Sequence, residues 1–182
     1  MKYLTSVLMC FFLLGCANTE RTSYGDSWFN DFNQLIIRSN NSFSFDTALS
    51  DSEYDIKKGL LNVEFGDHID TVVKKFGKPQ SINANKSYEV EGVTLNYGAS
   101  SYFKVNLDGD VVGIKVFNLD LKKLMLSNGV SFGNTKEEAK AVFSRYKIKR
   151  ESDKITTYVE GDFTYSLYFY RDQLASVTLT KF

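Results

Sequence analysis

The sequence predicts an α+β fold of two tandem units, with each unit's helix packed on one face of an antiparallel sheet. An amphipathic helical pattern follows Phe65-Gly66, and a second one follows Phe132-Gly133 at the same offset. Runs of alternating apolar residues, typical of strands, come after each helix. Similar patterns recurring at a fixed distance indicate an internal repeat.

The same patterns divide the chain into six segments. Their predicted roles follow the chain from an export signal to the second copy of the repeat. They are a signal peptide (1–15), a flexible tether (16–26), an N-terminal helix and loop (27–59), the first repeat (60–118), a linker (119–129) and the second repeat (130–182).

The N-terminal apolar run after Lys2 is too short for a transmembrane helix, which needs roughly 20 apolar residues. It fits the hydrophobic region of a signal peptide. The sequence Leu13-Leu14-Gly15-Cys16 that closes it resembles the lipobox of bacterial lipoproteins. The resemblance implies that Cys16 is lipidated and that Leu13, Leu14 and Gly15 are recognition positions. Ala17 stands where Asp would favour inner-membrane retention, which implies an outer-membrane anchor facing the periplasm. The alternative is an ordinary secretory signal with an incidental cysteine.

Composition narrows the function classes. Hydrophobic residues make up 43% of the 182 residues, enough for a packed core. The 22 basic and 22 acidic residues balance, which argues against a nucleic-acid partner. Cys10 lies in the signal and Cys16 in the lipobox, so the mature domain has neither a disulfide nor a thiol nucleophile.

The first elements after the tether are a helix and the first repeat. Apolar residues at helical spacing from Trp28 to Ile36 predict a helix, which either packs on the domain or docks on a partner or the bilayer surface. Packing is favoured because the helix lacks a basic face. In the first repeat, Asp67 is the expected N-cap of a helix that ends at Gly77 before Pro79. Predicted strands follow at 88–91, 93–97, 102–107 and 111–117, the last two joined at Asp108-Gly109.

The second repeat has the same expected order. Asn134 or Thr135 caps a helix that carries Ala139, Val142 and Phe143. A hairpin follows, with strands at 163–170 and 174–179. Leucines in the linker 119–129 suggest an added edge segment.

The first repeat resembles the periplasmic lipoprotein domain of the BamE (SmpA/OmlA) family, whose architecture is shared with the tandem-repeat β-lactamase inhibitory protein. The matching positions are Gly66, Val72, Gly77-Lys78-Pro79, Tyr97 and Asp108-Gly109. The match covers 60–117 well and 130–182 weakly. The resemblance implies the tandem fold, and it raises two roles: accessory to envelope assembly, and inhibitor or immunity protein.

Catalytic and metal chemistry are not predicted. His68 is the single histidine, and one histidine without cysteines does not build a zinc site. Asp108-Gly109-Asp110 fits a hairpin turn better than a calcium loop, which needs more spaced oxygens. No phosphate-binding loop, nucleophile elbow or zinc-protease motif is present. We therefore expect no cofactor, no metal and no enzymatic activity.

The predicted sheet has a tyrosine-rich outer face. If Tyr165 and Leu167 face the helix, Tyr168 and Tyr170 point outward, and Tyr102 and Lys104 do so in the first repeat. Tyrosine is enriched at protein interfaces, although it also simply suits strands. These four residues are the candidate binding surface for a protein partner in the envelope. The alternatives are an enzyme acting on cell wall or lipid, and a carrier of a small ligand or lipid.

Overall fold

The computed structural model describes residues 54–87, 90–121 and 123–182. The predicted signal peptide, the lipobox with Cys16, the tether and the helix near Trp28 lie outside the described residues. The described elements, in chain order, are β1 (Gly59–Leu60), β2 (Val63–Glu64), α2 (Ile69–Phe76), β3 (Ser81–Ser87), β4 (Val90–Tyr97), β5 (Ser101–Asn106), β6 (Val111–Phe117), α3 (Lys136–Val142), β7 (Lys147–Glu151), β8 (Ile155–Glu160), β9 (Phe163–Tyr170) and β10 (Gln173–Lys181).

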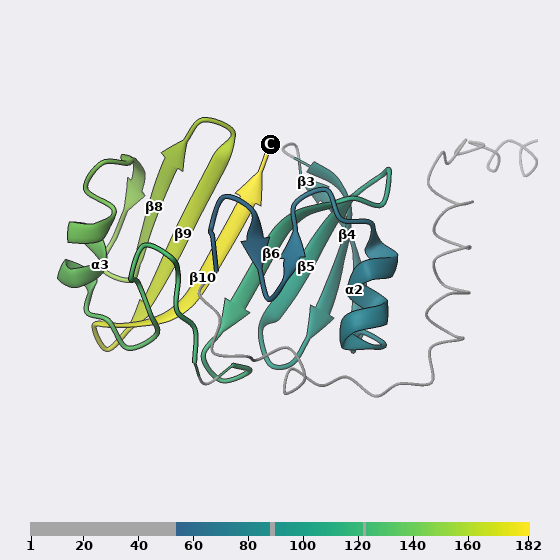
Figure 1. The fold of residues 1–182 in the computed structure, drawn as a ribbon, viewed down its shortest axis with the longest axis horizontal. Helices are drawn as coiled ribbons and strands as arrows, with labels where there is room; N and C mark the ends of the chain where they lie inside the picture. Colours follow the sequence, from purple (N-terminus) through teal and green to yellow (C-terminus); the bar gives the residue numbers. More distant parts are fainter. Residues whose placement is uncertain (1–53, 88–89, 122) are drawn as a thin grey trace, which may run out of the picture.

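A single antiparallel sheet of eight strands dominates the described structure. Its strand order is β3-β4-β5-β6-β10-β9-β8-β7, and a separate hairpin pairs β1 with β2 (Figure 1). At the centre, β6 pairs with β10 over five residue pairs, from Ser176↔Phe117 to Thr180↔Gly113. The chain therefore joins its two halves edge to edge at this β6–β10 seam.

The predicted α+β class of two helix-plus-sheet units is wrong, because the described fold is mostly β and its main sheet is continuous. A helix followed by four strands does occur twice along the chain, but the two sets of strands form one sheet. The physical reason is the seam: two separate sheets would each leave an edge with unpaired backbone groups, and β6–β10 pairing satisfies both edges. The helices are also short, with eight residues in α2 and seven in α3.

The strand predictions are confirmed at one hairpin and need correction elsewhere. The hairpin at Asp108-Gly109 is confirmed, with β5 and β6 on either side. The described parts of the strands expected at 88–91 and 93–97 form one strand, because β4 runs from Val90 to Tyr97 through Gly92 without a break. Residues 88–89 lie outside the described residues. The sheet edges β3 and β7 were not predicted, since their sequences SINANKS and KIKRE lack a sustained apolar alternation.

One face of the sheet is apolar and carries the core. A single cross-strand row runs over all eight strands, and every member is apolar: Ile82, Leu95, Phe103, Ile114, Leu179, Tyr165, Tyr158 and Ile148. Side chains alternate between the faces of a strand, so their sequence neighbours point to the opposite face. We call this second side, which neither of the two described helices covers, the helix-free face.

Helices, the short hairpin and a loop cover the apolar face. Figure 1 shows α2 and α3 at opposite ends of the sheet, with β1 and β2 between them. The Phe76 ring of α2 stacks on Phe103, with centroids 5.2 Å apart, and Phe143 at the end of α3 stacks on Tyr158 at 4.8 Å. The linker is not an edge strand of the main sheet: Leu121, Leu124 and Leu126 are buried in the core, and Leu119 is 75% exposed.

The predicted N-cap is wrong for α2 and is confirmed for α3. His68, not Asp67, caps α2, and its Nδ1 accepts the Asp70 N–H at 3.4 Å. The Asp67 carboxylate instead accepts the Glu64 N–H at 2.9 Å. Thr135 caps α3 in a capping box with Glu138, as one of the two predicted candidates.

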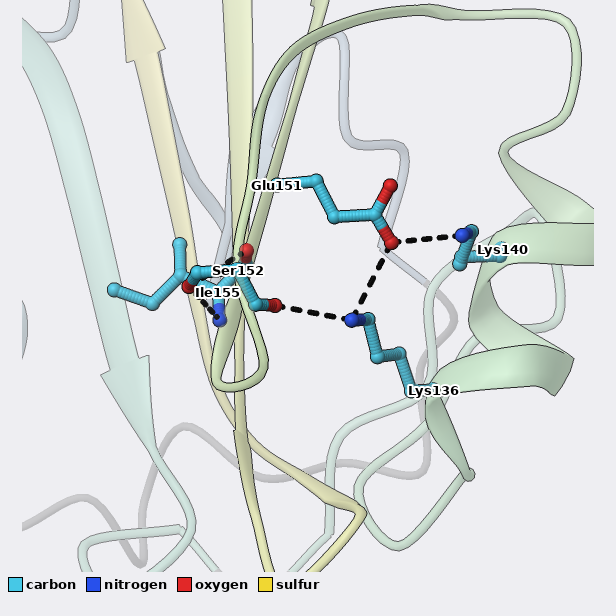
Figure 2. Close-up of polar contacts among 5 residues, drawn as sticks. All are labelled: Lys136, Lys140, Glu151, Ser152 and Ile155. Atoms are coloured by element: carbon cyan, nitrogen blue, oxygen red, sulfur yellow. Dashed lines mark hydrogen bonds and ion pairs between the residues drawn. The ribbon is translucent and has the colours of Figure 1, made fainter.

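A cluster of charges ties α3 to the edge strand β7 (Figure 2). Glu151 Oε1 lies 2.7 Å from Lys140 Nζ and 3.3 Å from Lys136 Nζ. Lys136 Nζ also donates to the Ser152 carbonyl at 3.0 Å. Hydrogen bonds from Lys140 and then Lys136 lower the pKa of the Glu151 carboxyl. The cluster holds the end of the sheet against its covering helix.

Candidate binding surface on the helix-free face

Three cross-strand rows define the helix-free face. The central row spans all eight strands: Ser81, Asn96, Tyr102, Lys115, Thr178, Ser166, Thr157 and Arg150. The lysine row lies beside it: Asn83, Thr94, Lys104, Gly113, Thr180, Thr164, Val159 and Lys147. A shorter row, the apolar strip, lies on the other side: Phe117, Ser176, Tyr168 and Ile155. Side chains opposite each other in a row are close neighbours.

Tyr102 is held in place by its neighbours on this face. Lys104 Nζ and Lys115 Nζ lie 5.8 Å and 5.6 Å from the centroid of its ring. Burial raises the pKa of the Tyr102 hydroxyl, against the effect of a side-chain hydrogen bond with Thr178. An aromatic ring fixed before binding loses little conformational freedom when a partner covers it.

Gly113 makes room for Lys104. A Cβ at Gly113 would lie 3.1 Å from Lys104 Cβ and 3.3 Å from Lys104 Cδ, across the β5–β6 pair. The lysine stem therefore lies over the glycine. A side chain at this position would press on the lysine stem, which would have to shift by a few tenths of an ångström.

A groove of about 350 Å³ opens where β6, β10, β9 and β8 meet. It crosses the β6–β10 seam, so both halves of the chain contribute to it. The Thr157 and Ser166 hydroxyls, on neighbouring strands, lie 3.1 Å apart at this position. The lining residues are Ser100, Lys115, Phe117, Ile155, Ser166, Leu167, Tyr168, Ser176 and Thr178.

Among the described residues that line the groove, Lys115 is the only charged one. Its Nζ donates to Ser100 Oγ at 3.1 Å. Burial lowers the pKa of the Lys115 ammonium, and the charge of Asp120 opposes that shift. No salt bridge joins Lys115 to a carboxylate in the described part of the chain. The groove thus holds a half-buried cation without a paired anion.

The structure places the predicted surface residues as follows. Tyr102 and Lys104 are neighbours on the helix-free face, and Tyr168 lines the groove. Tyr170 is 56% exposed at the end of β9, with the Arg171 guanidinium 5.3 Å from its ring centroid. Sequence patterns missed Lys115, Phe117 and Ser176, whose convergence depends on the long-range β6–β10 pairing. The alternation within 111–117 could have placed Lys115 and Phe117 on one face.

Features of other site classes are few in the described residues. No group of three or more histidine, cysteine, aspartate and glutamate residues is placed to hold a metal there. The His68 side chain is 54% exposed, and its Nδ1 lies 3.4 Å from Asp70 Oδ2. Among the described helices, none has the length and apolar character needed to cross a bilayer.

Comparisons with protein-family models, with curated proteins and with solved structures found no match to this chain. The resemblance to the BamE family at 60–117 stays a prediction. The helix-free face, with its ordered tyrosine, its lysines and its groove, is the candidate functional site.

Proposed function

We propose that this chain is a non-enzymatic protein-binding module, held at the periplasmic side of the outer membrane by a lipid on Cys16. The observation that carries the binding proposal is the helix-free face, where the ammonium groups of Lys104 and Lys115 lie over the Tyr102 ring next to a groove. The lipobox resemblance of Leu13-Leu14-Gly15-Cys16 supports the anchor.

The face carries aromatic side chains of the kind that act as anchors in protein interfaces. Protein interfaces are enriched in tyrosine and other aromatic residues, and their strongest contacts cluster around well-packed anchors. Here Tyr102, Phe117 and Tyr168 lie on one face with hydroxyl-bearing side chains between them. The serines and threonines offer hydrogen bonds to a partner without long side chains to immobilise.

Two roles fit such a module. In one, the chain is an accessory that holds a component of an envelope assembly. In the other, it is an inhibitor or immunity protein that covers the working surface of an envelope-directed enzyme. Both roles need the same face, so the first experiment addresses the face itself.

Site-specific photocrosslinking in living cells tests the proposal. A photoreactive phenylalanine analogue replaces Tyr168 in one strain and Val142 in a control strain, since Val142 is exposed on α3 at the other side of the sheet. We expect a discrete protein adduct from position 168 and none from position 142. The same adducts from both positions, or none from position 168, would contradict the proposal.

The anchor is tested separately by fractionation. The Cys16→Ser protein should stay unlipidated and should no longer be recovered in the outer-membrane fraction. The Cys10→Ser protein should still be recovered there. Unchanged membrane association of Cys16→Ser would refute lipidation at Cys16, and the crosslinking result would stand on its own.

A further inference from the structure

The helix-free face carries charge of one sign among the described residues. Its three rows contain Lys104, Lys115, Lys147 and Arg150, and no described member of the rows is acidic. The salt bridges of the described residues involve none of these four cations. Acidic groups such as Glu151 and Glu160 pair instead with lysines elsewhere. To whatever covers it, the described part of this face therefore presents four cations that form no salt bridge.

Asp120 is the carboxylate whose charge acts on Lys115, and it is already occupied. Its oxygens accept the backbone N–H groups of Ala99, Ser100 and Ser101 and the Ser101 hydroxyl. A carboxylate with that many donors is committed to the β4–β5 turn. It acts on Lys115 through its charge but forms no salt bridge with the ammonium, so Lys115 Nζ can still pair directly with a carboxylate from another molecule.

The groove combines this cation with an apolar strip. Phe117 follows Lys115 by two positions on β6, so their side chains are spaced roughly 7 Å along the strand. Tyr168 and Ile155 continue the strip on β9 and β8. A ligand that fills the groove would thus meet the ammonium of Lys115 on one side and rings or methyl groups on the other.

Ser176 adds an unused polar group at the same place. It lies between Phe117 and Tyr168 in the apolar strip and lines the groove. The residue is 1% exposed, and its Oγ has no hydrogen-bond partner among the described residues. Buried hydroxyls are normally paired with protein or ordered water, so the Ser176 hydroxyl is available to a water or a ligand group that enters the groove.

We propose that the groove receives an acidic segment of a partner protein, with a carboxylate pairing with Lys115 Nζ and an adjacent apolar side chain covering Phe117 and Tyr168. The inference rests on the proposed protein-binding function and names the partner's chemistry. A carboxylate fits better than a phosphate-rich partner, because nucleic acids and anionic lipid surfaces engage several converging cations. The groove offers one cation and an apolar strip.

The first test selects ligands without assuming a partner. A phage-displayed library of random twelve-residue peptides is selected on the full-length chain in neutral detergent, with the Lys115→Gln chain as the counter-selection. We expect enriched peptides to carry Asp or Glu within a few positions of an aromatic or large aliphatic residue. Enrichment of neutral or basic peptides that still need Tyr168 would overturn the acidic-partner inference and leave the binding function intact.

The second test measures one enriched peptide by fluorescence anisotropy with an uncharged label. Replacing its acidic residue with the amide analogue, or Lys115 with Gln, should weaken the Kd by about tenfold, the value of one charge-assisted hydrogen bond. Lys115→Arg should restore most of the affinity. Lys74→Gln is the matched control, because Lys74 is exposed on α2, and it should leave the Kd unchanged.

Three outcomes would contradict one or both of the two proposals. If the Kd is equal for the acidic peptide and its amide analogue while Tyr168→Ala abolishes binding, the acidic-partner inference fails and the protein-binding function stands. If no selected peptide depends on Tyr168 or Tyr102, both fail. Binding to phosphatidylglycerol vesicles through Lys115, without binding to acidic peptides, would likewise overturn the inference in favour of a lipid surface.

Discussion

Removing the Asp120 carboxylate tests how the β4–β5 turn is built. Asp120 Oδ2 accepts the Ser100 and Ser101 N–H groups, each at 3.0 Å, and the Ser101 hydroxyl at 2.7 Å. A Cβ at Gly98 would lie 2.2 Å from Asp120 Oδ1, so the turn fits around the carboxylate. Asp120→Ala removes the acceptor and leaves its donors in place.

The cost follows from which donors lose contact with water. Ser101 is 2% exposed, so its N–H would stay buried and unpaired, at a cost of about 1–3 kcal/mol. The half-buried Ser100 N–H adds about 1 kcal/mol, because water replaces part of the lost bond. Ala99 is exposed, and its N–H finds water. We expect Asp120→Ala to lower the free energy of unfolding by about 3 kcal/mol.

Urea unfolding and thermal melting measure the effect. A loss of about 3 kcal/mol corresponds to a fall in Tm of roughly 6–12 °C for a chain of this size. Asp120→Asn keeps one acceptor oxygen and should lose about half as much free energy. Asp108→Ala in the β5–β6 turn is the matched control and should change stability by less than about 0.5 kcal/mol. A loss below about 1 kcal/mol for Asp120→Ala would refute the view that the carboxylate organises the turn.

Three further predictions concern the helices and the core. The pKa of Glu151 is lowered in the folded state, so the stabilisation from its carboxylate is present above the unfolded carboxyl pKa of about 4.3 and is lost as pH falls through the folded value. Glu151→Gln should therefore make the urea midpoint depend less steeply on pH between pH 6 and pH 3. An unchanged dependence on pH would contradict this prediction. Tyr158→Phe should be neutral or stabilising by thermal melting, because the Tyr158 hydroxyl is buried without a hydrogen-bond partner among the described residues. Tyr97→Phe should cost about 1 kcal/mol, because it removes the 3.0 Å hydrogen bond to the Gly77 carbonyl. Equal losses of stability in the two variants would contradict this difference in hydrogen bonding. Thr135→Ala should cost about 1 kcal/mol in urea unfolding through loss of the capping box, and Thr135→Ser should not; equal losses would show that the hydroxyl is not what caps α3.

Local signals in the sequence predicted local structure well. The Asp108-Gly109 hairpin and the capping role of Thr135 both depend on a few neighbouring residues. His68 took the cap from Asp67 because the helix begins one residue later and Asp67 accepts the Glu64 N–H instead. When neighbouring positions both carry polar side chains that can cap a helix, the sequence alone does not decide which of the two is the N-cap.

Long-range pairing could not be predicted in the same way. The pairing of Val116 with Val177 joins strands that are far apart in sequence, and no local pattern encodes it. That pairing converts two expected units into one sheet. It also brings Lys115 and Phe117 next to Tyr168, which explains why the tyrosine and not the groove was predicted. The edge strands were missed because a polar edge strand has no apolar face to reveal it.

Because the groove lies across the β6–β10 seam, binding of a ligand there would be coupled to the pairing of the two halves of the sheet. A ligand that contacts Phe117 on one side and Tyr168 on the other would bridge the two halves of the sheet. By mass action, a ligand that binds only when β6 and β10 are paired stabilises that pairing, and separation of the two strands favours release of the ligand. Separating the two halves of the sheet would then release the bound molecule, and the affinity for that molecule would report whether β6 and β10 are paired.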